Sequence, residues 1–351
     1  MRRLLPKLKK KHGTALVLSG GATKAFYFHL GVLKALMPEP ITSIIGTSAG
    51  ALIGAFLASG ADVETMIASA NQKALYVAKY DATIDMLSAS SLFRPKLDSW
   101  IAQGGQTMLA ALRFLMSLPN TLLKRDPLSE LIDQLVVSQT EISGFFDSSV
   151  LERIFTSLMP SNNFTDTEID LYVTATSLDS RERAVFNSVY SFRDASNHFM
   201  RDVPIHRAIR ASTAIPGLFD PVKIQGRYYI DGEVKQTLST DIGVALADRV
   251  IVSHTYQPLQ LGGGQTVADL GWLNILKQSV SIIFYERIAT WRDIYAEQYP
   301  NKEIIWIEPE PDDLEFFLAP EFSFRPEINK QMIHSGELAA LKALGKSRVI
   351  A

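Results

Sequence analysis

The stretch ITSIIGTSAGALIGAF, residues 41–56, decides the fold of this 351-residue chain. It opens with a β-branched apolar run, turns at the pentapeptide GTSAG (46–50), and continues as an apolar segment of helical length. A G-x-S-x-G turn between a strand and a helix lifts its serine out of the sheet, and the flanking glycines let the backbones approach closely. We therefore expect Ser48 to be a nucleophile; the alternative is a glycine-rich turn with an idle serine.

A second glycine-rich turn lies upstream, in LVLSGGATKAFYFHLGVL, residues 16–33. We expect a strand to end at Ser19 and a helix to begin near Ala25 or Phe26. Backbone N–H groups at such a turn can hold negative charge, which in acyl transfer is the oxyanion of the tetrahedral intermediate. The turn could equally cradle a phosphate, but a dinucleotide site needs G-x-G-x-x-G and an acidic residue about twenty positions later. This sequence lacks that pattern.

The segment RYYIDGEV, residues 227–234, supplies a candidate base. An Asp-Gly pair is usually a turn, but the Ser48 hydroxyl needs a proton acceptor within about 2.6–3.2 Å to become a nucleophile. Asp231 closes a strand in this segment and can serve as that acceptor. The chain has six histidines, none in a recognisable motif after an aspartate: His12, His29, His198, His206, His254 and His334.

Around these segments, apolar β-branched runs alternate with helical patterns, which favours an α/β domain with a largely parallel sheet. We expect strands at residues 15–19, 41–45, 171–176, 183–187, 228–230, 250–253 and 304–307, and helices at 28–37, 49–58 and 272–297. A basic leader, 1–12, is expected before one domain, 13–351, which has a helical insertion without a clear strand at about 64–166. Within the insertion, residues 107–128 are either a core-facing helix or an apolar lid that admits acyl chains.

The composition excludes several classes of protein. The net charge is −2, from 35 basic and 37 acidic residues, which gives no reason to expect a nucleic-acid partner. There are no cysteines, so disulfides, thiolate metal sites and a cysteine nucleophile are excluded. No cluster of His, Asp and Glu has the spacing of metal ligands, so we expect neither a metal nor a cofactor.

The location of the protein is predicted from two segments. The leader lacks the apolar run of a secretory signal, so it is either a solvated tail or a weak electrostatic anchor to anionic lipid. The residues between Glu39 and Asp62 carry no charge over a length that could span a bilayer, but they include Pro40 and four glycines. A buried strand and helix explain that mixture better. We expect a cytoplasmic protein, with peripheral membrane association as an alternative.

Together these segments resemble the patatin-like phospholipases, a family related to cytosolic phospholipase A2. The glycine-rich turn, the GTSAG pentapeptide and Asp231-Gly232 match family motifs in order. ASTAIPGLFDPV, residues 211–222, matches the Pro-containing segment before the Asp motif, and the resemblance runs from about Thr14 to the final helix. It implies a three-layer α/β/α hydrolase with a mainly parallel sheet, which cleaves lipid or phospholipid esters with a Ser48–Asp231 dyad and no histidine. It also implies an oxyanion hole at Gly20, Gly21 and Ala22.

The chain departs from the family pattern at four positions. Ala22 replaces the third glycine, Lys24 the usual Arg, Ala25 a glycine, and Glu233 the usual Gly or Ala. The Ala22 methyl group restricts φ if the loop requires positive values, and Glu233 places a second carboxylate beside the base. Lys24 either binds a head-group phosphate or stabilises the loop.

Two other interpretations stay open. One is an ordinary α/β-hydrolase esterase with a Ser–Asp–His triad, in which His254 or His334 is the base. The other, from a different class, is a lipid-binding protein that kept the fold and lost activity through the changes at Ala22 and Glu233.

Overall fold

The computed structural model of the chain describes residues 5–69, 74–77, 82–85, 94–95, 144–149, 152, 156, 161–323 and 325–345. Its centre is a ten-stranded sheet of order β15-β14-β1-β2-β7-β8-β10-β9, in which β13 pairs with β7 and β12 with β13. From β15 to β7 every neighbouring pair is parallel, whereas β8 and β13 both run antiparallel to β7. The ten strands are β1 (Thr14–Leu18), β2 (Ile41–Thr47), β7 (Asp170–Ser177), β8 (Arg183–Phe186), β9 (Phe192–Arg193), β10 (Asn197–Met200), β12 (Val222–Ile224), β13 (Arg227–Asp231), β14 (Arg249–Ser253) and β15 (Glu303–Ile307).

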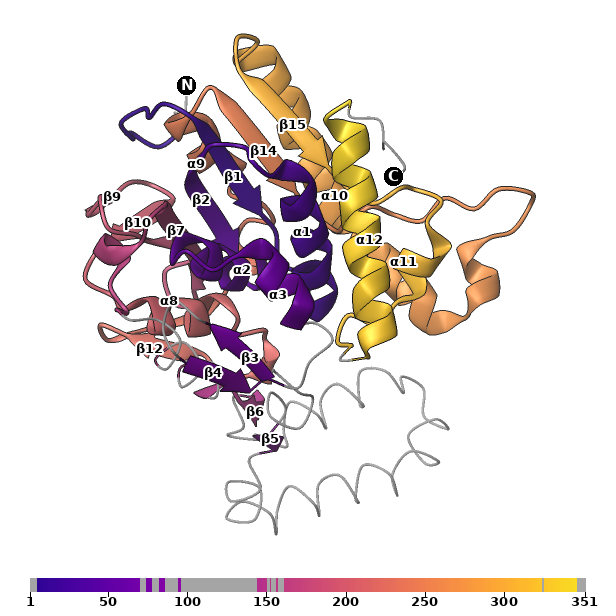
Figure 1. Cartoon of the computed structure of the whole chain (residues 1–351), viewed down its shortest axis with the longest axis horizontal. Helices are drawn as coiled ribbons and strands as arrows, with labels where there is room; N and C mark the ends of the chain where they lie inside the picture. The colour runs from indigo at the N-terminus through magenta and orange to yellow at the C-terminus, as the bar shows by residue number, and fades with distance from the viewer. Residues whose placement is uncertain are drawn as a thin grey trace, which may run out of the picture.

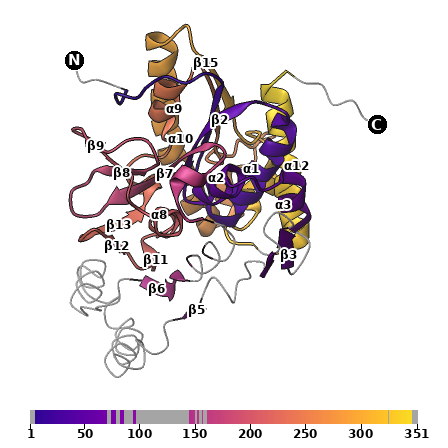
Figure 2. The ribbon, with the colours of Figure 1, turned by 60° about the vertical axis from the view of Figure 1, so that its left-hand side comes forward.

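Helices cover both faces of this sheet (Figures 1 and 2). Side chains of β1 alternate between two cores, with Leu16 and Leu18 on one face and Ala15 and Val17 on the other. The strand is buried along its whole length, as expected for a parallel strand that is covered on both sides. The predicted three-layer α/β/α fold with a mainly parallel sheet is therefore confirmed. The helices are α1 (Ala22–Leu36), α2 (Ala49–Ala58) and α12 (Pro326–Ala343) on the first face, and α9 (Thr240–Leu246) and α10 (Trp272–Gln298) on the second.

Two glycines let α1 and α12 pack with their backbones in contact. A Cβ atom added at Gly31 would lie 1.8 Å from the carbonyl oxygen of Ile333, and one added at Gly336 would lie 2.0 Å from that of Phe28. No larger residue fits at either position without moving the helices apart. The C-terminal helix is thus fixed against the helix that follows the glycine-rich turn, although the two are far apart in sequence (Figure 1).

The main elements lie where the sequence predicts them, with one shift. All seven expected strands are present, and the uncharged stretch after Glu39 is the buried strand β2 followed by α2. The helix α1, however, begins at Ala22 and not near Ala25 or Phe26. The glycine-rich turn is therefore tighter than expected, because the helix starts directly after Gly21.

The expectation that residues 64–166 contain no clear strand is wrong, and their description as an inserted helical segment stays a prediction. The part of it that the structure describes contains a hairpin of β3 and β4, and β6 pairs with β5 and with β11 of the main domain. The residues 107–128 lie outside the described residues. The smaller elements are α3 (Val63–Ser69), β3 (Ala74–Val77), β4 (Ala82–Asp85), β5 (Arg94–Pro95), β6 (Gly144–Asp147), η2 (Phe164–Asp166), α8 (Ile205–Ser212), β11 (Gly217–Phe219), η3 (Gly232–Val234), η4 (Val267–Leu270) and α11 (Leu314–Leu318).

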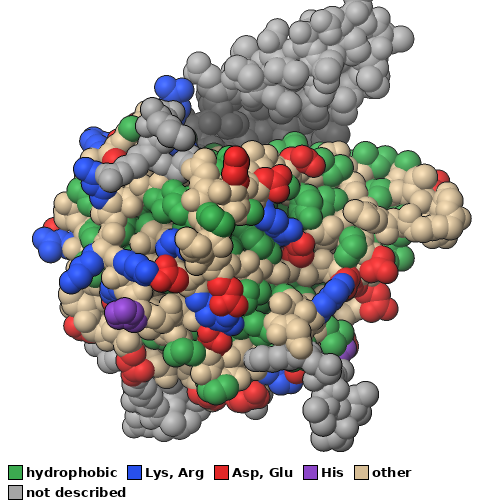
Figure 3. All heavy atoms as spheres, turned by 90° about the horizontal axis from the view of Figure 1, so that it is seen from above, with side chains coloured by type: hydrophobic (Ala, Val, Ile, Leu, Met, Phe, Trp, Pro, Cys, Tyr) green, Lys and Arg blue, Asp and Glu red, His purple; other side chains and the backbone are tan. Residues whose placement is uncertain are grey.

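The described part of the basic leader lies along the domain and is not a free tail. The Lys9 N–H donates to the Tyr190 hydroxyl at 2.7 Å, and the Lys11 N–H donates to the Leu246 carbonyl at 2.6 Å. On the face shown in Figure 3, basic and acidic side chains are interspersed with hydrophobic ones, as the near-neutral net charge suggests. Among the helices described, none is long and apolar enough to cross a membrane.

Candidate active site

Ser48 and Asp231 are brought together by the way that two strands share one edge of β7. Strand β2 runs parallel to β7 and ends with Thr47 opposite Thr174. Strand β13 runs in the opposite direction along the same edge and ends with Asp231 opposite Ala175. The two strands therefore meet end to end at adjacent positions of β7. Since Ser48 directly follows β2, it faces the end of β13 where Asp231 lies.

The turn at Ser48 is strained in the manner expected of a nucleophile elbow. Ser48 has φ 51° and ψ −117°, a left-handed conformation that a serine rarely adopts. A Cβ atom at Gly46 would lie 2.5 Å from the Gly50 carbonyl oxygen, and one at Gly50 would lie 2.4 Å from that of Leu18. Both glycines of the pentapeptide are thus required by close backbone contacts, as the sequence predicts.

A buried serine that the sequence did not single out supports this turn. The Ser48 N–H donates to Ser212 Oγ at 2.8 Å, and the Ser212 hydroxyl donates to the Thr174 carbonyl at 2.7 Å. Ser212 lies at the end of α8 and is the second residue of the Pro-containing segment 211–222. It ties the elbow to β7 and fixes the backbone at the nucleophile.

The Asp231 carboxylate is buried, with 5% of the residue exposed. Burial raises the pKa of Asp231 to about 6, while the Glu233 N–H and the Ser48 side chain, as hydrogen-bond donors, act to lower it. The Glu233 N–H donates to Asp231 Oδ1 at 3.0 Å. An aspartate with its pKa near neutrality can accept a proton and return it within one catalytic cycle, which suits a general base.

The glycine-rich turn presents two open backbone N–H groups at the start of α1. Gly21 has φ 125° and Ala22 has φ 56°, so Ala22 adopts the positive φ that the sequence analysis questioned. In the part of the chain that the structure describes, neither the Gly21 N–H nor the Ala22 N–H has a hydrogen-bond partner. The Gly20 N–H, by contrast, donates to Glu233 Oε1 at 2.6 Å. Of the three predicted oxyanion donors, Gly20 is therefore already occupied.

Two contacts fix the Ser19 carbonyl at the start of the glycine-rich turn, one from the elbow and one from α1. The Gly50 N–H donates to the Ser19 carbonyl at 3.0 Å, and His29 Nε2 lies 3.0 Å from the same oxygen. Burial lowers the pKa of His29 to about 4, so the ring is neutral at physiological pH. Because the Ser19 carbonyl can only accept, Nε2 carries the proton of the neutral ring, and Nδ1 accepts from the Ser253 hydroxyl at 2.8 Å. No sequence pattern indicates this role, because a lone buried histidine on a helix belongs to no motif.

Lys24 is committed to partners within the protein. Its side chain is 4% exposed, and its Nζ lies 4.1 Å from the centre of the Phe316 ring and 3.5 Å from Glu321 Oε1. Burial lowers the pKa of Lys24 to about 8. These contacts favour the loop-stabilising role, and binding of a head-group phosphate stays a prediction.

The two histidines of the triad interpretation lie away from the dyad. His254 is fully buried with Nε2 3.0 Å from Glu308 Oε2, and burial lowers the pKa of His254. His334 is exposed on α12. In the described ranges, neither side chain contacts Ser48 or Asp231.

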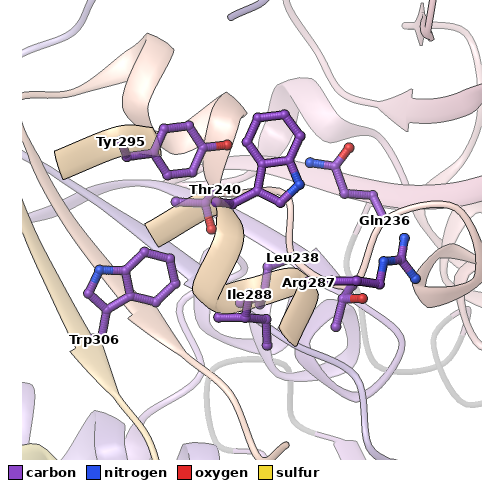
Figure 4. Close-up of a pocket in the computed structure, with 9 residues that line it drawn as sticks. Gln236, Leu238, Thr240, Arg287, Ile288, Tyr295 and Trp306 are labelled. Carbon is purple, nitrogen blue, oxygen red and sulfur yellow. The ribbon is translucent and has the colours of Figure 1, made fainter. Parts of the chain in front are cut away.

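A separate cavity opens beside α10, on the opposite face of the sheet from α1 (Figure 4). Aromatic side chains of Trp291, Tyr295 and Trp306 line it together with Arg287, and neither Ser48 nor Asp231 is part of its wall. Among the described residues, no group of three or more His, Asp or Glu side chains is arranged to hold a metal ion.

Comparison with known proteins relates this site to one family. The family model described as Patatin-like phospholipase matches residues 16–243, well over half of the chain. A patatin-like phospholipase domain-containing protein of Aspergillus clavatus is 51% identical over 53 residues, which cover 14% of this chain and 7% of that protein. One from Pyricularia oryzae is 44% identical over 66 residues, which cover 18% of this chain and 8% of that protein. The matches thus cover less than a tenth of the length of these relatives.

Among solved structures, VipD from Legionella pneumophila aligns with a TM-score of 0.41 and 15% identity, covering 98% of this chain and 70% of VipD. ExoU of Pseudomonas aeruginosa, solved in complex with SpcU, aligns with a TM-score of 0.36 and 16% identity, covering 96% of this chain and 52% of the other. The matched residues 16–243 include the glycine-rich turn, the elbow and the Asp-Gly motif. The chain belongs to the patatin-like phospholipase family.

Proposed function

We propose that this protein is a lipid acyl hydrolase that cleaves carboxylic esters with a Ser48–Asp231 dyad. The observation that carries the proposal is the pairing on β7, which sets the ends of β2 and β13 against each other at Thr174 and Ala175. Family membership supports lipid hydrolysis, and the strained elbow supports a serine nucleophile.

In the acylation step, Ser48 Oγ attacks the ester carbonyl carbon while Asp231 accepts the hydroxyl proton. The oxyanion that forms is held by the N–H groups of Gly21 and Ala22 at the start of α1, where the helix dipole also favours negative charge. The Ala49 N–H, which directly follows the nucleophile, is a third donor of the kind used in such elbows. Collapse of the intermediate expels the alcohol, which takes the proton from Asp231 and leaves an acyl group on Ser48.

In the deacylation step, Asp231 accepts a proton from a water molecule that attacks the acyl carbon. Breakdown of the second intermediate releases the carboxylic acid, and the proton returns from Asp231 to Ser48 Oγ. The dyad therefore needs one base with a pKa near the working pH, which the burial of Asp231 supplies. No histidine takes part in either step.

The triad esterase is less well supported, because His254 is paired with Glu308 and His334 is exposed on α12. The inactive lipid-binding protein is also less well supported. Ala22 adopts the positive φ of a glycine without disturbing α1, and Glu233 holds the turn instead of blocking it.

The test combines labelling with a fluorophosphonate probe and incubation with a panel of phospholipids and neutral lipids, with products identified by mass. Ser48→Ala should abolish labelling and lower hydrolysis by at least about 10³-fold, because the acyl-enzyme cannot form. Ser59→Ala, at the other end of α2, is the matched control and should be labelled like the wild type. Hydrolysis that survives in Ser48→Ala, after contaminating esterases are excluded, would rule out the nucleophile.

A further inference from the structure

Glu233 packs directly against the glycine-rich turn, as Ser48 does. The residue is 8% exposed, and its Oε1 accepts the Gly20 N–H at 2.6 Å. A Cβ atom placed on Gly20 would lie 2.9 Å from Glu233 Cγ and 3.0 Å from Ser48 Cβ. Gly20 has no positive φ, so it is needed here for space and not for its backbone conformation. The stem of Glu233 and the nucleophile are thus the two side chains against which the turn packs.

The hydrogen bond from Gly20 to Glu233 restricts a part of the turn that would otherwise have high conformational freedom. Two consecutive glycines have many accessible backbone conformations, and ordering them costs more free energy than ordering other residues. The Ser19 hydroxyl donates to the Gly20 carbonyl at 2.8 Å, which fixes one side of this residue. Glu233 fixes the other side through the N–H. The next two N–H groups along the chain are those of Gly21 and Ala22.

The surroundings of Glu233 favour the neutral acid. Burial and then the neighbouring Asp231 carboxylate raise the pKa of Glu233 well above its ordinary value. The Gly20 N–H, the Tyr256 hydroxyl and then Arg287 from α10 act in the other direction, but the net shift is upward. Oε2 has no hydrogen-bond partner at normal distance among the described residues, although the Tyr256 hydroxyl from the loop after β14 is close enough to interact with the carboxyl. A carboxylate here would be a buried charge next to the Asp231 carboxylate, which is unfavourable.

We propose that Glu233 is a positioning residue, whose carboxyl group holds Gly20 so that the Gly21 and Ala22 N–H groups stay aimed at the oxyanion. This inference rests on the proposed function. It gives a role to Glu233, which occupies a position where the family usually has Gly or Ala. Loss of the acceptor would loosen the turn and weaken oxyanion binding, which acts in the transition state more than in the bound ester. Ionisation of Glu233 would place a second negative charge near the oxyanion, so activity should fall at alkaline pH.

The test measures kcat and KM for Ser48-dependent ester hydrolysis from acidic to alkaline pH in three variants. Glu233→Ala removes the acceptor and should lower kcat by about 10- to 100-fold with KM nearly unchanged. Glu233→Gln keeps an acceptor oxygen without the titrating proton, so it should retain most of kcat at neutral pH and lose the alkaline decline. Glu39→Gln, at the opposite end of β2, is the matched control for a partly buried glutamate and should keep the wild-type profile.

The outcomes separate this inference from the proposed function. If Glu233→Ala keeps the kcat and the pH profile of the wild type and Ser48 is labelled normally, the positioning role alone is overturned. So does a Glu233→Gln variant that loses as much kcat as Glu233→Ala. If Glu233→Ala fails to fold, as thermal unfolding would show, the pH profile of Glu233→Gln decides. Folded wild-type protein without Ser48-dependent labelling overturns the proposed function, and the positioning role with it.

Discussion

Because the Asp231 carboxylate is buried, we predict that replacing it by a neutral side chain lowers activity and raises stability. Burial raises the pKa of Asp231 from 3.8 to about 6, which means that the folded state binds its proton more tightly than the unfolded state does. The contribution of Asp231 to wild-type stability therefore falls as pH rises from about 4 to about 6, because the folded state is then forced to ionise a buried group. A shift of this size corresponds to about 3 kcal/mol above pH 6.

Asp231→Asn removes this cost while keeping the shape and the oxygen that accepts the Glu233 N–H. We expect the variant to be more stable than the wild type by up to about 3 kcal/mol at pH 8, with the difference disappearing below about pH 4. Its hydrolysis should fall by about 10²- to 10⁴-fold. The substitution should also lower the pKa of Glu233, because the Asp231 carboxylate is one cause of its raised value.

The assay is urea unfolding of both proteins at several pH values, with equal m-values as the check that the midpoints can be compared. Turnover is measured on the same samples. If Asp231→Asn is less stable than the wild type at pH 8, or if the difference does not depend on pH, the buried charge of Asp231 does not destabilise the folded state. If the variant stays active while a histidine variant is inactive and folded, the dyad is wrong.

Three further predictions follow from single positions. Ala22→Gly should raise stability by about 1 kcal/mol and leave turnover nearly unchanged, because Ala22 has φ 56°; a lower melting temperature would contradict this. His254→Gln should retain most of the Ser48-dependent hydrolysis, and its loss in a folded variant would revive the triad. Gly50→Ala should prevent formation of the elbow, since the new methyl group would lie 2.4 Å from the Leu18 carbonyl oxygen, and wild-type labelling in this variant would refute the close contact.

The sequence predicts the local backbone geometry of the site well, because the relevant constraints are local. The glycines of GTSAG are required by contacts within a few residues of Ser48 and with the neighbouring strand, so their spacing alone indicates the elbow. The strand positions are also local, since buried parallel strands are continuous apolar runs. For this reason β1 and β2 were predictable to within two residues at each end.

The contacts that complete the site depend on pairings between distant segments. Asp231 meets Ser48 only because β13 enters antiparallel behind β2 on the same edge of β7, and an apolar run does not reveal its direction. The contact of Glu233 with Gly20 and that of His29 with Ser19 also join segments that no motif connects. The sequence could therefore name the two residues of the proposed dyad through a family resemblance, but not the residues that hold them in place.

The backbone contact between α1 and α12 sets the smallest fragment that could fold. The family match ends at residue 243, before β14, β15 and α12. A fragment cut there would leave β1 without its neighbour on one side and would uncover the face of α1 that Gly31 and Gly336 bring against α12. Because α1 starts at the glycine-rich turn, the loss would reach the oxyanion site directly. The described residues after position 243 thus help to hold the glycine-rich turn, although the proposed dyad and the proposed oxyanion donors all precede them.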